Sequence, residues 1–249
     1  MGGALLQQWS RSADWDFTVV DPFAETVPEG VTLLKAREDV PDTLFDLLIV
    51  AVKPQMIDEV MPAYRTSLAP SGVVASIAAG CSVDRLKAAT GAGAVIRIMP
   101  NLPALIAQGV SGLYASPDCT DAQKTAVETL MQRAGTTVWV GDEDALDRVT
   151  AVAGSGPGYV FEIARTYIAA AEALGFTNDQ ARALVLGTMA GAVEMARQSD
   201  ETVEALRNSV TSKNGTTQAG LEALNADGTL SELLLRTTQA AYERAVELR

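Results

Sequence analysis

The chain has 249 residues, a formal net charge of −12 and a pI near 4.5. This acidity argues against nucleic acid and anionic membranes as partners, and no apolar run has the length of a transmembrane helix. The sequence contains no His, which excludes Ser-His-Asp and Cys-His machinery and any imidazole metal site. Chemistry must therefore come from a cofactor, from hydroxyls, carboxylates and lysines, or from backbone dipoles.

The two cysteines and the N-terminus bear on the compartment. Cys81 and Cys119 lack metal-binding spacing and are too few for a disulfide framework. The N-terminus shows no basic stretch followed by an apolar core, so no signal peptide is expected. We therefore expect a protein of the reducing cytoplasm.

Strand and helix signals alternate through the first half of the chain. Apolar segments predict strands at residues 17–20, 31–34, 47–52, 73–77, 94–98, 110–114 and 137–140. Amphipathic segments predict helices at 4–12, 55–66, 83–89 and 121–133. This alternation predicts an α/β fold, a doubly wound Rossmann-like domain over residues 1–142.

After Gly141 the strand signals vanish and Ala-rich helical periodicity continues to the C-terminus. Helices are predicted at 145–153, 159–174, 178–198, 201–209, 217–224 and 230–248, with Gly175 as a C-cap. We expect residues 143–249 to form an all-helical dimerisation and substrate domain. Its apolar positions, for example Leu184, Val185 and Met189, exceed what one small bundle can bury. We therefore expect a homodimer formed through this half.

The stretch 210–224 contains a hydroxyl-rich, Gly-containing turn that opens a helix. Asn214 and Gly215 tolerate positive φ, and Ser212, Thr216 and Thr217 supply hydroxyls. Free N–H groups and the positive end of the helix dipole suit a small anion. An ordinary helix start, capped by Thr216 or Thr217, is the alternative interpretation.

Small residues and prolines follow the predicted strands of the first half. In such a sheet the carboxyl ends of the strands carry the ligand loops. An acidic residue after the second strand of the dinucleotide fold, here Asp21, would hold ribose hydroxyls. Plain turn chemistry explains each loop singly, but four together favour a dinucleotide. The candidate cofactor residues are Gly2, Asp21, Ala51, Val52, Lys53, Pro54, Ala78, Ala79, Gly80, Met99, Pro100 and Asn101.

The glycine-rich dinucleotide motif is represented only by its last part. Gly2 would be the third glycine, which packs helix against sheet. The first strand and the two phosphate-facing glycines do not precede it. We expect a chain that begins at Met1 to bind dinucleotide weakly and to leave open strand edges beside 17–20 and 47–52.

Five motifs in order resemble the pyrroline-5-carboxylate reductase family, over essentially the whole chain. The most specific is VTSKNGTTQAG at 210–220, which is similar to the family signature VTSPGGTT-x-AG. The others are AVKPQ at 51–55, SIAAG at 76–80, RIMPNLPA at 97–104 and AGSGPGYVF at 153–161. The chain departs from the family pattern at Lys213-Asn214 for Pro-Gly, at Leu102 for Thr and at Gly158 for Ala.

The resemblance implies reduction of 1-pyrroline-5-carboxylate to L-proline by NADH or NADPH, the last step of proline biosynthesis. It implies that Gly215 and Thr216 hold the substrate carboxylate through their N–H groups, with help from Ser212, and that Thr217 hydrogen-bonds the ring nitrogen. Glu143 matches a substrate-site position, although an acid at a helix N-terminus explains it equally well. The family also suggests a ring of dimers. Asp21 should repel a 2′-phosphate, which favours NADH.

Two other functions are open at this point. One is a non-catalytic dimeric scaffold derived from such an enzyme. The other is a related imine or 2-hydroxyacid reductase, whose catalytic acid is commonly a Lys on a long helix. The helices of residues 145–198 contain no Lys, which counts against this second alternative.

Overall fold

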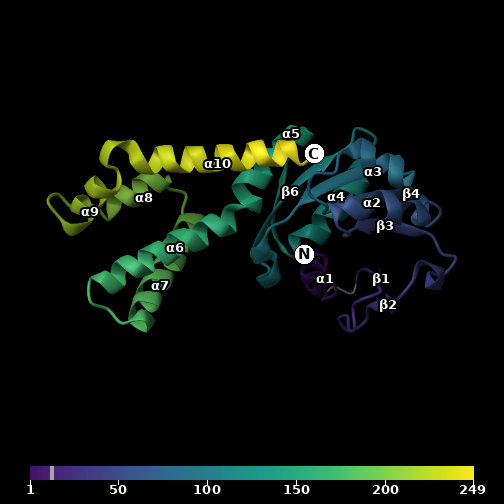
Figure 1. The fold of residues 1–249 in the computed structure, drawn as a ribbon, viewed down its shortest axis with the longest axis horizontal. Helices are drawn as coiled ribbons and strands as arrows, with labels where there is room; N and C mark the ends of the chain where they lie inside the picture. Colours follow the sequence, from purple (N-terminus) through teal and green to yellow (C-terminus); the bar gives the residue numbers. More distant parts are fainter. Residues whose placement is uncertain (12–13) are drawn as a thin grey trace. The chain divides into compact units, whose positions relative to one another are not determined.

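A computed structural model describes residues 1–11 and 14–249, which form two compact units. The sheet unit comprises Met1–Pro157 and Ala240–Arg249, and the helical unit comprises Gly158–Gln239 (Figure 1). The strands are β1 (Thr18–Val20), β2 (Thr32–Leu34), β3 (Phe45–Val50), β4 (Leu68–Ser76), β5 (Val95–Met99), β6 (Gly109–Ala115) and β7 (Gly135–Trp139). The α-helices are α1 (Gly2–Trp9), α2 (Ile57–Val60), α3 (Val83–Thr90), α4 (Asp121–Gln132), α5 (Glu143–Val149), α6 (Gly156–Ala173), α7 (Asn178–Gln198), α8 (Val203–Ser209), α9 (Thr216–Leu224) and α10 (Thr229–Glu247).

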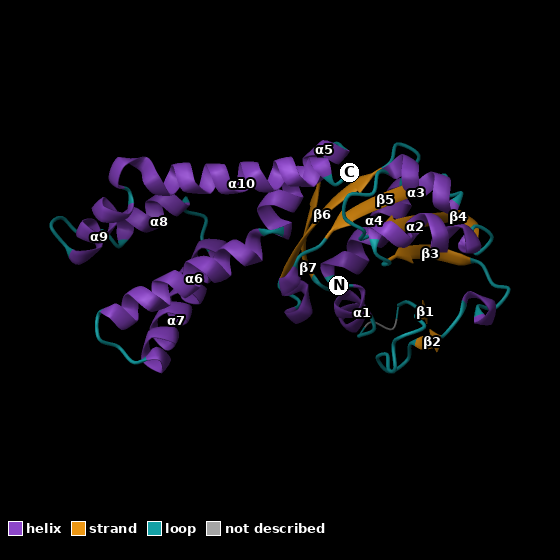
Figure 2. Cartoon of the chain, in the orientation of Figure 1, coloured by secondary structure: helices purple, strands orange, loops and turns teal. Residues whose placement is uncertain are grey.

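The strands form two sheets (Figure 2). β1 pairs in parallel with β2, and a second sheet has the order β3-β4-β5-β6-β7. Within the described residues β1 pairs only with β2, and β3 pairs only with β4, so the open edges expected beside 17–20 and 47–52 are present. β6 runs antiparallel to β5, whereas the other pairs are parallel. The connection from Pro100 to Gln108 is too short for a crossover of about a dozen residues, which a parallel return would need.

Helices cover both faces of the five-stranded sheet. On one face, Leu5 and Trp9 of α1 and Leu130 of α4 pack with Ile96 and Leu113 of the sheet. On the other face, residues of α2 and α3 pack with alternate residues of β3, β4 and β5, namely Val50, Val74 and Val95. The two-sided core bears out the predicted Rossmann-like domain.

Two predicted helices differ in kind from the structure, whereas the limits of several others shift by only one to three residues. The segment predicted as a helix at 55–66 is a 3₁₀ turn (Pro54–Met56), then α2, then a second 3₁₀ turn (Met61–Tyr64). Pro62 breaks it, because proline has no N–H to donate within a helix. The helix predicted at 145–153 begins two residues earlier, behind the cap Asp142, and passes into a π-helical turn, Thr150–Gly154. Residue 12, the predicted end of the first helix, lies outside the described residues.

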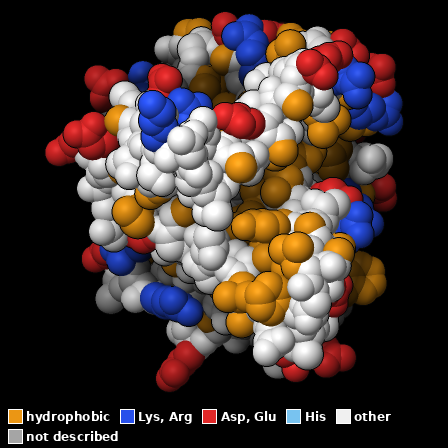
Figure 3. Space-filling view, turned by 90° about the vertical axis from the view of Figure 1, so that its left-hand side faces the viewer, with side chains coloured by type: hydrophobic (Ala, Val, Ile, Leu, Met, Phe, Trp, Pro, Cys, Tyr) orange, Lys and Arg blue, Asp and Glu red, His pale blue; other side chains and the backbone are white. Residues whose placement is uncertain are grey.

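The helical unit has side-chain caps on α7 and α8 and a small core of its own. Thr177 and Gln180 form a capping box on α7, and Gly175, at φ 101°, ends α6 as predicted. Its buried cluster is only Ala171, Ala181 and Val185, with Ile168 and Met189 against it. Larger apolar side chains of this unit stay exposed, such as Leu174 at 82% and Met195 at 63%. Figure 3, in which the left-hand side of Figure 1 faces the viewer, shows apolar side chains gathered on that face. Among the described helices, none is long and apolar enough to cross a membrane.

Candidate active site

Three of the four predicted cofactor loops meet at one edge of the sheet. β3, β4 and β5 are parallel neighbours, so their carboxyl ends lie side by side. The loops that follow them are Ala51–Pro54, Ile77–Gly80 and the segment that starts at Pro100. Asp21 follows β1 in the separate two-stranded sheet, so strand pairing does not link it to this edge.

The start of α1 lies against the end of β3. A Cβ added to Gly2 would lie 3.0 Å from the Cβ of Ala51, a distance that forces the neighbour to shift. Glycine therefore permits the close packing of helix on strand that the third glycine of a dinucleotide motif provides. No side chain caps α1 at its start, so its first N–H groups are available to donate to an anion. These features fit a bound dinucleotide phosphate.

Asp21 is partly used by its own turn. Its Oδ1 accepts hydrogen bonds from the N–H of Phe23 at 2.8 Å and of Ala24 at 3.1 Å. These bonds fix the carboxylate at the end of β1 in an Asx-type turn. One carboxylate oxygen of Asp21 thus has a local role.

Asn101 joins three segments behind the edge. Its side chain donates to the carbonyl of Ala153 at 3.0 Å and accepts from the N–H of Val110 at 2.9 Å. The residue is 7% exposed. The amide therefore ties the loop after β5 to β6 and to the π-helical turn, and π-helical turns are frequent at functional sites. Met99 faces the same turn, since a Cβ on Gly154 would lie 3.6 Å from its sulfur.

Glu143, the first residue of α5, is held in a buried ion pair. Its Oε1 lies 2.6 Å from Nη1 of Arg97 and accepts a hydrogen bond from the N–H of Val83 at 2.9 Å. The Arg97 side chain is 3% exposed. The pair joins β5, α5 and the start of α3. The sequence analysis missed Arg97, although a lone charge inside the apolar strand Val95–Met99 is the signal that would have found it.

The hydroxyl-rich turn lies in the helical unit, ahead of α9. Asn214 has φ 58°, as expected for a residue that tolerates positive φ. Gly215, by contrast, has φ −85° and is the N-cap of α9, so neither Thr216 nor Thr217 caps the helix. Glycine makes room there for a neighbour: an added Cβ would lie 2.3 Å from Oγ of Ser212 and 3.1 Å from its carbonyl oxygen, so this hydroxyl would have to move. The missing side chain lets the Ser212 hydroxyl approach the helix start.

The N–H groups of this turn divide into two sets. Gly215 donates its N–H to the carbonyl of Ser212 at 3.0 Å, and Asn214 donates to Oε1 of Gln218 at 2.7 Å. The expected anion donor Gly215 therefore has a local acceptor. Thr216 and Thr217 occupy the first two positions of α9, where N–H groups have no intrahelical acceptor. These two groups and the Ser212 hydroxyl are the donors suited to a small anion.

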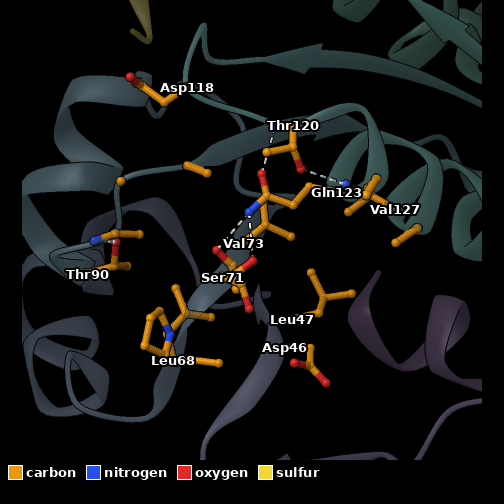
Figure 4. A pocket seen from close by; sticks show the side chains of 18 of the residues that line it. Asp46, Leu47, Leu68, Ser71, Val73, Thr90, Asp118, Thr120, Gln123 and Val127 are labelled. Carbon is orange, nitrogen blue, oxygen red and sulfur yellow. Dashed lines mark hydrogen bonds between the residues drawn. The ribbon is translucent and has the colours of Figure 1, made fainter.

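Other features of the described residues of the sheet unit bear on its chemistry. No group of three or more potential metal-ligating residues occurs in the part of the chain that the structure describes. Cys81 is buried, and burial raises the pKa of its thiol, which keeps the thiol neutral. A cavity of about 710 Å³ lies at the amino ends of the strands, between β4 and the start of α4 (Figure 4). There Gln123 donates to the carbonyls of Ser71 and Gly72, so this side chain serves local structure.

The family model that matches this chain and two of its sequence relatives carry the name of one enzyme. Residues 143–248 match the family model described as pyrroline-5-carboxylate reductase dimerisation. A pyrroline-5-carboxylate reductase of Pseudomonas aeruginosa is 40% identical over 204 residues, which cover 82% of this chain and 74% of that protein. The enzyme of that name from Pasteurella multocida is 35% identical, covering 93% of this chain and 87% of the other.

Solved structures agree with these relatives. A pyrroline-5-carboxylate reductase from Coxiella burnetii superposes with a TM-score of 0.91 at 30% identity and covers 99% of this chain and 94% of its own. A pyrroline carboxylate reductase of Plasmodium falciparum, solved with NADP bound, shares the fold at a TM-score of 0.85 and 24% identity, covering 100% of this chain and 94% of its own. With identity above 30% across most of both chains, this protein belongs to the pyrroline-5-carboxylate reductase family.

Proposed function

We propose that the chain reduces 1-pyrroline-5-carboxylate to L-proline, the last step of proline biosynthesis. The observation that carries this proposal is the 40% identity to the Pseudomonas aeruginosa reductase over 82% of the chain. When bound, NADH or NADPH supplies the hydride for the imine carbon. The chain's own residues have to bind the two molecules, orient them and exclude water.

The loops at the sheet edge are proposed to hold the dinucleotide. Gly2 lets α1 approach the sheet, and its open N-terminus would hold phosphate. The loops Ala51–Pro54, Ala78–Gly80 and Met99–Asn101 would lie along the cofactor, with Ala79 and Lys53 exposed. Asn101 would act from behind, because its side chain holds the loop to the π-helical turn.

We further propose that Asp21 sets a preference for NADH. Its Oδ1 is used by the turn, so Oδ2 is the atom assigned to the ribose hydroxyls. A carboxylate at this place would repel the 2′-phosphate of NADPH.

The turn before α9 is proposed as the substrate carboxylate site. The N–H groups of Thr216 and Thr217 and the hydroxyl of Ser212 would donate to the carboxylate, while Gly215 leaves room for that hydroxyl. The Thr217 hydroxyl would hydrogen-bond the ring nitrogen. A protonated imine is a good electrophile, so no strong acid is required of the protein. For Glu143, both contacts use Oε1, and Oε2 is the atom assigned to the substrate.

Assembly and location complete the proposal. The match to a dimerisation model and the exposed apolar side chains of the helical unit support a homo-oligomer. We propose a homodimer through this unit, with a larger ring of dimers as its extension, and a cytoplasmic location, where the two free cysteines stay reduced. Light scattering at micromolar concentration should give at least the dimer mass, and a monomer would refute this assembly.

The test of function is an assay of the purified chain. Cofactor oxidation is followed with the imine and either NADH or NADPH, and a reaction without imine serves as the control. Oxidation that requires the imine and yields proline is expected, with a higher kcat/KM for NADH. No imine-dependent oxidation with either cofactor would overturn the proposal, whereas a clear NADPH preference would overturn only the role of Asp21.

A further inference from the structure

We propose that Arg249 and Asp147 form a latch that positions the loop after β4 for the dinucleotide. The latch presses the backbone of Leu248 against Gly80, in the loop Ala78–Gly80. This inference rests on the proposed function, because that loop is one of those assigned to the cofactor. All the residues concerned belong to the sheet unit.

Gly80 and Leu248 are in direct backbone contact. A Cβ added to Gly80 would lie only 2.3 Å from the carbonyl oxygen of Leu248 and 3.0 Å from its carbonyl carbon. Gly80 also has φ +69°, a conformation that L side chains rarely adopt. The shape of the loop therefore depends both on glycine and on where Leu248 lies.

Leu248 is held in place by its neighbour in the sequence. Nε of Arg249 lies 2.9 Å from Oδ2 of Asp147 on α5, an ion pair without a hydrogen bond at this oxygen, and the Asp147 side chain is 4% exposed. A second contact joins Nη2 of Arg249 to Oδ1 of Asp144 at 3.7 Å. Tyr242 of α10 donates to the same Asp144 oxygen at 2.6 Å. The last turns of α10 are thus fixed on α5 from two points.

The Asp147 carboxylate needs the guanidinium. Burial raises its pKa, and Arg249 and then Arg97 are the charges that lower it. Removing Arg249 would leave a buried carboxylate without its nearest cation, an unfavourable arrangement that favours rearrangement of the segment. A displaced Leu248 would no longer restrain Gly80.

The two ends of the loop have separate supports. Ala78 donates its N–H to Oγ of Ser76 at 3.2 Å, and Val83 donates to Glu143 at 2.9 Å. Gly80 lies between these anchors and meets Leu248. Loss of the latch should therefore loosen the middle of the loop while the strand and the start of α3 remain in place.

The experiment compares Arg249→Met with the matched control Arg244→Met in the full chain. Arg244 is on α10, shortly before Arg249, and pairs with Glu247 at the surface, where both side chains are more than 60% exposed. Two quantities are measured: the Kd for NADH by calorimetry, and hydrogen exchange of the amides of residues 79–81 without cofactor. We expect Arg249→Met to raise the NADH Kd about fivefold to tenfold, a usual size for coupling between sites, and to speed exchange in the loop. Arg244→Met should change neither.

The conservative variant Arg249→Lys and the two measurements distinguish failure of the latch from failure of the proposed function. Arg249→Lys keeps the charge and should restore part of the loop protection and affinity. An unchanged NADH Kd in Arg249→Met, or exchange that rises equally across the whole sheet unit, would overturn the latch. If the unaltered chain binds no NADH, the proposed function fails, and the exchange measurement still decides whether Arg249 orders the loop.

Discussion

The two candidate sites are built in different ways. Behind the cofactor edge of the sheet, buried polar side chains fix the loops: Asn101 joins three segments, and Glu143 is paired with an Arg97 that is 3% exposed. At the turn before α9, Ser212, Thr216 and Thr217 are exposed, and the contacts are short-range bonds within the turn. The first site is supported by the interior of its own unit. The second presents donors at a helix start and has little packing behind it.

This difference says where mutations should act. A side chain in the buried support should change the free energy of unfolding together with activity. A side chain of the exposed turn should change substrate kinetics and leave stability nearly unaltered. The predictions below test this division, beginning with the largest expected effect.

The largest effect is expected from Glu143→Ala. The change leaves the Arg97 guanidinium buried without its carboxylate and the Val83 N–H without its acceptor. Removing one partner of a buried pair costs about 3–5 kcal/mol of unfolding free energy. Denaturant unfolding measures this free energy. The stability of Glu143→Gln should fall between that of the unaltered chain and that of Glu143→Ala.

The control for this prediction is Glu162→Ala on α6. Glu162 pairs with Arg165, but these side chains are 61% and 67% exposed, so the loss should be far smaller than in Glu143→Ala. Equal losses in the two variants would show that the edge of the sheet has no special buried support, and the contrast between the sites would disappear.

The next effect is expected from Gly215→Ala, with Gly220→Ala on the same helix as its matched control. The new Cβ at Gly215 would meet Oγ of Ser212 at 2.3 Å, whereas one at Gly220 meets nothing within 4 Å. Displacing the hydroxyl and the helix start should raise the substrate KM about a hundredfold and weaken inhibition by free proline. Steady-state kinetics measures both. An unchanged KM for Gly215→Ala would exclude the Ser212 hydroxyl as a donor to the carboxylate.

A smaller effect is expected from Thr217→Ala. If its hydroxyl bonds the ring nitrogen, loss of a hydrogen bond to a charged group, worth roughly 1.5–3 kcal/mol, should lower kcat/KM about tenfold to a hundredfold. Because Gly215 and not Thr217 is the N-cap, the melting temperature should stay nearly constant. Both are measured on one preparation. A destabilised enzyme with normal kinetics would mean that Thr217 serves only the helix.

The sequence predicted the architecture well because it rests on local patterns. Apolar periodicity located the sheet and the helices, and the Thr177–Gln180 capping box marks the start of α7 at the predicted residue. Other features depend on contacts that no local pattern carries. The antiparallel β6 follows from a short connection, and the Pro62 break was hidden inside an amphipathic pattern.

The site residues show the same limit. The sequence suggested that Gly215 serves a positive φ, but its φ is negative. Glycine at this position instead leaves space for Ser212, three residues earlier. Asn101 resembled a ligand-facing residue, whereas the hydrogen bonds of its side-chain amide go to Val110 on β6 and to Ala153 in the π-helical turn. Residue types were thus predictable, but the atoms that each one contacts were not.

The smallest effect concerns pH, at the junction of α5 and α10. The pKa of Asp144 is lowered first by the Tyr242 hydrogen bond and then by that of Arg148. A carboxyl group whose pKa is lower in the folded state stabilises that state above its unfolded pKa, and this contribution is lost as the pH falls through the folded value. Asp144→Asn should therefore be less stable than the unaltered chain at neutral pH, and the difference should vanish in acid, below the ordinary value of 3.8.

Denaturant unfolding from neutral pH into this acid range measures the difference. The Asp144 side chain is 35% exposed, so salt should shrink the effect. In the unaltered chain, Tyr242→Phe should cause part of the same loss of stability at neutral pH. In the Asp144→Asn background it should cause no further loss, because the two residues share one hydrogen bond. A stability difference that persists unchanged in acid would show that Asp144 acts through packing.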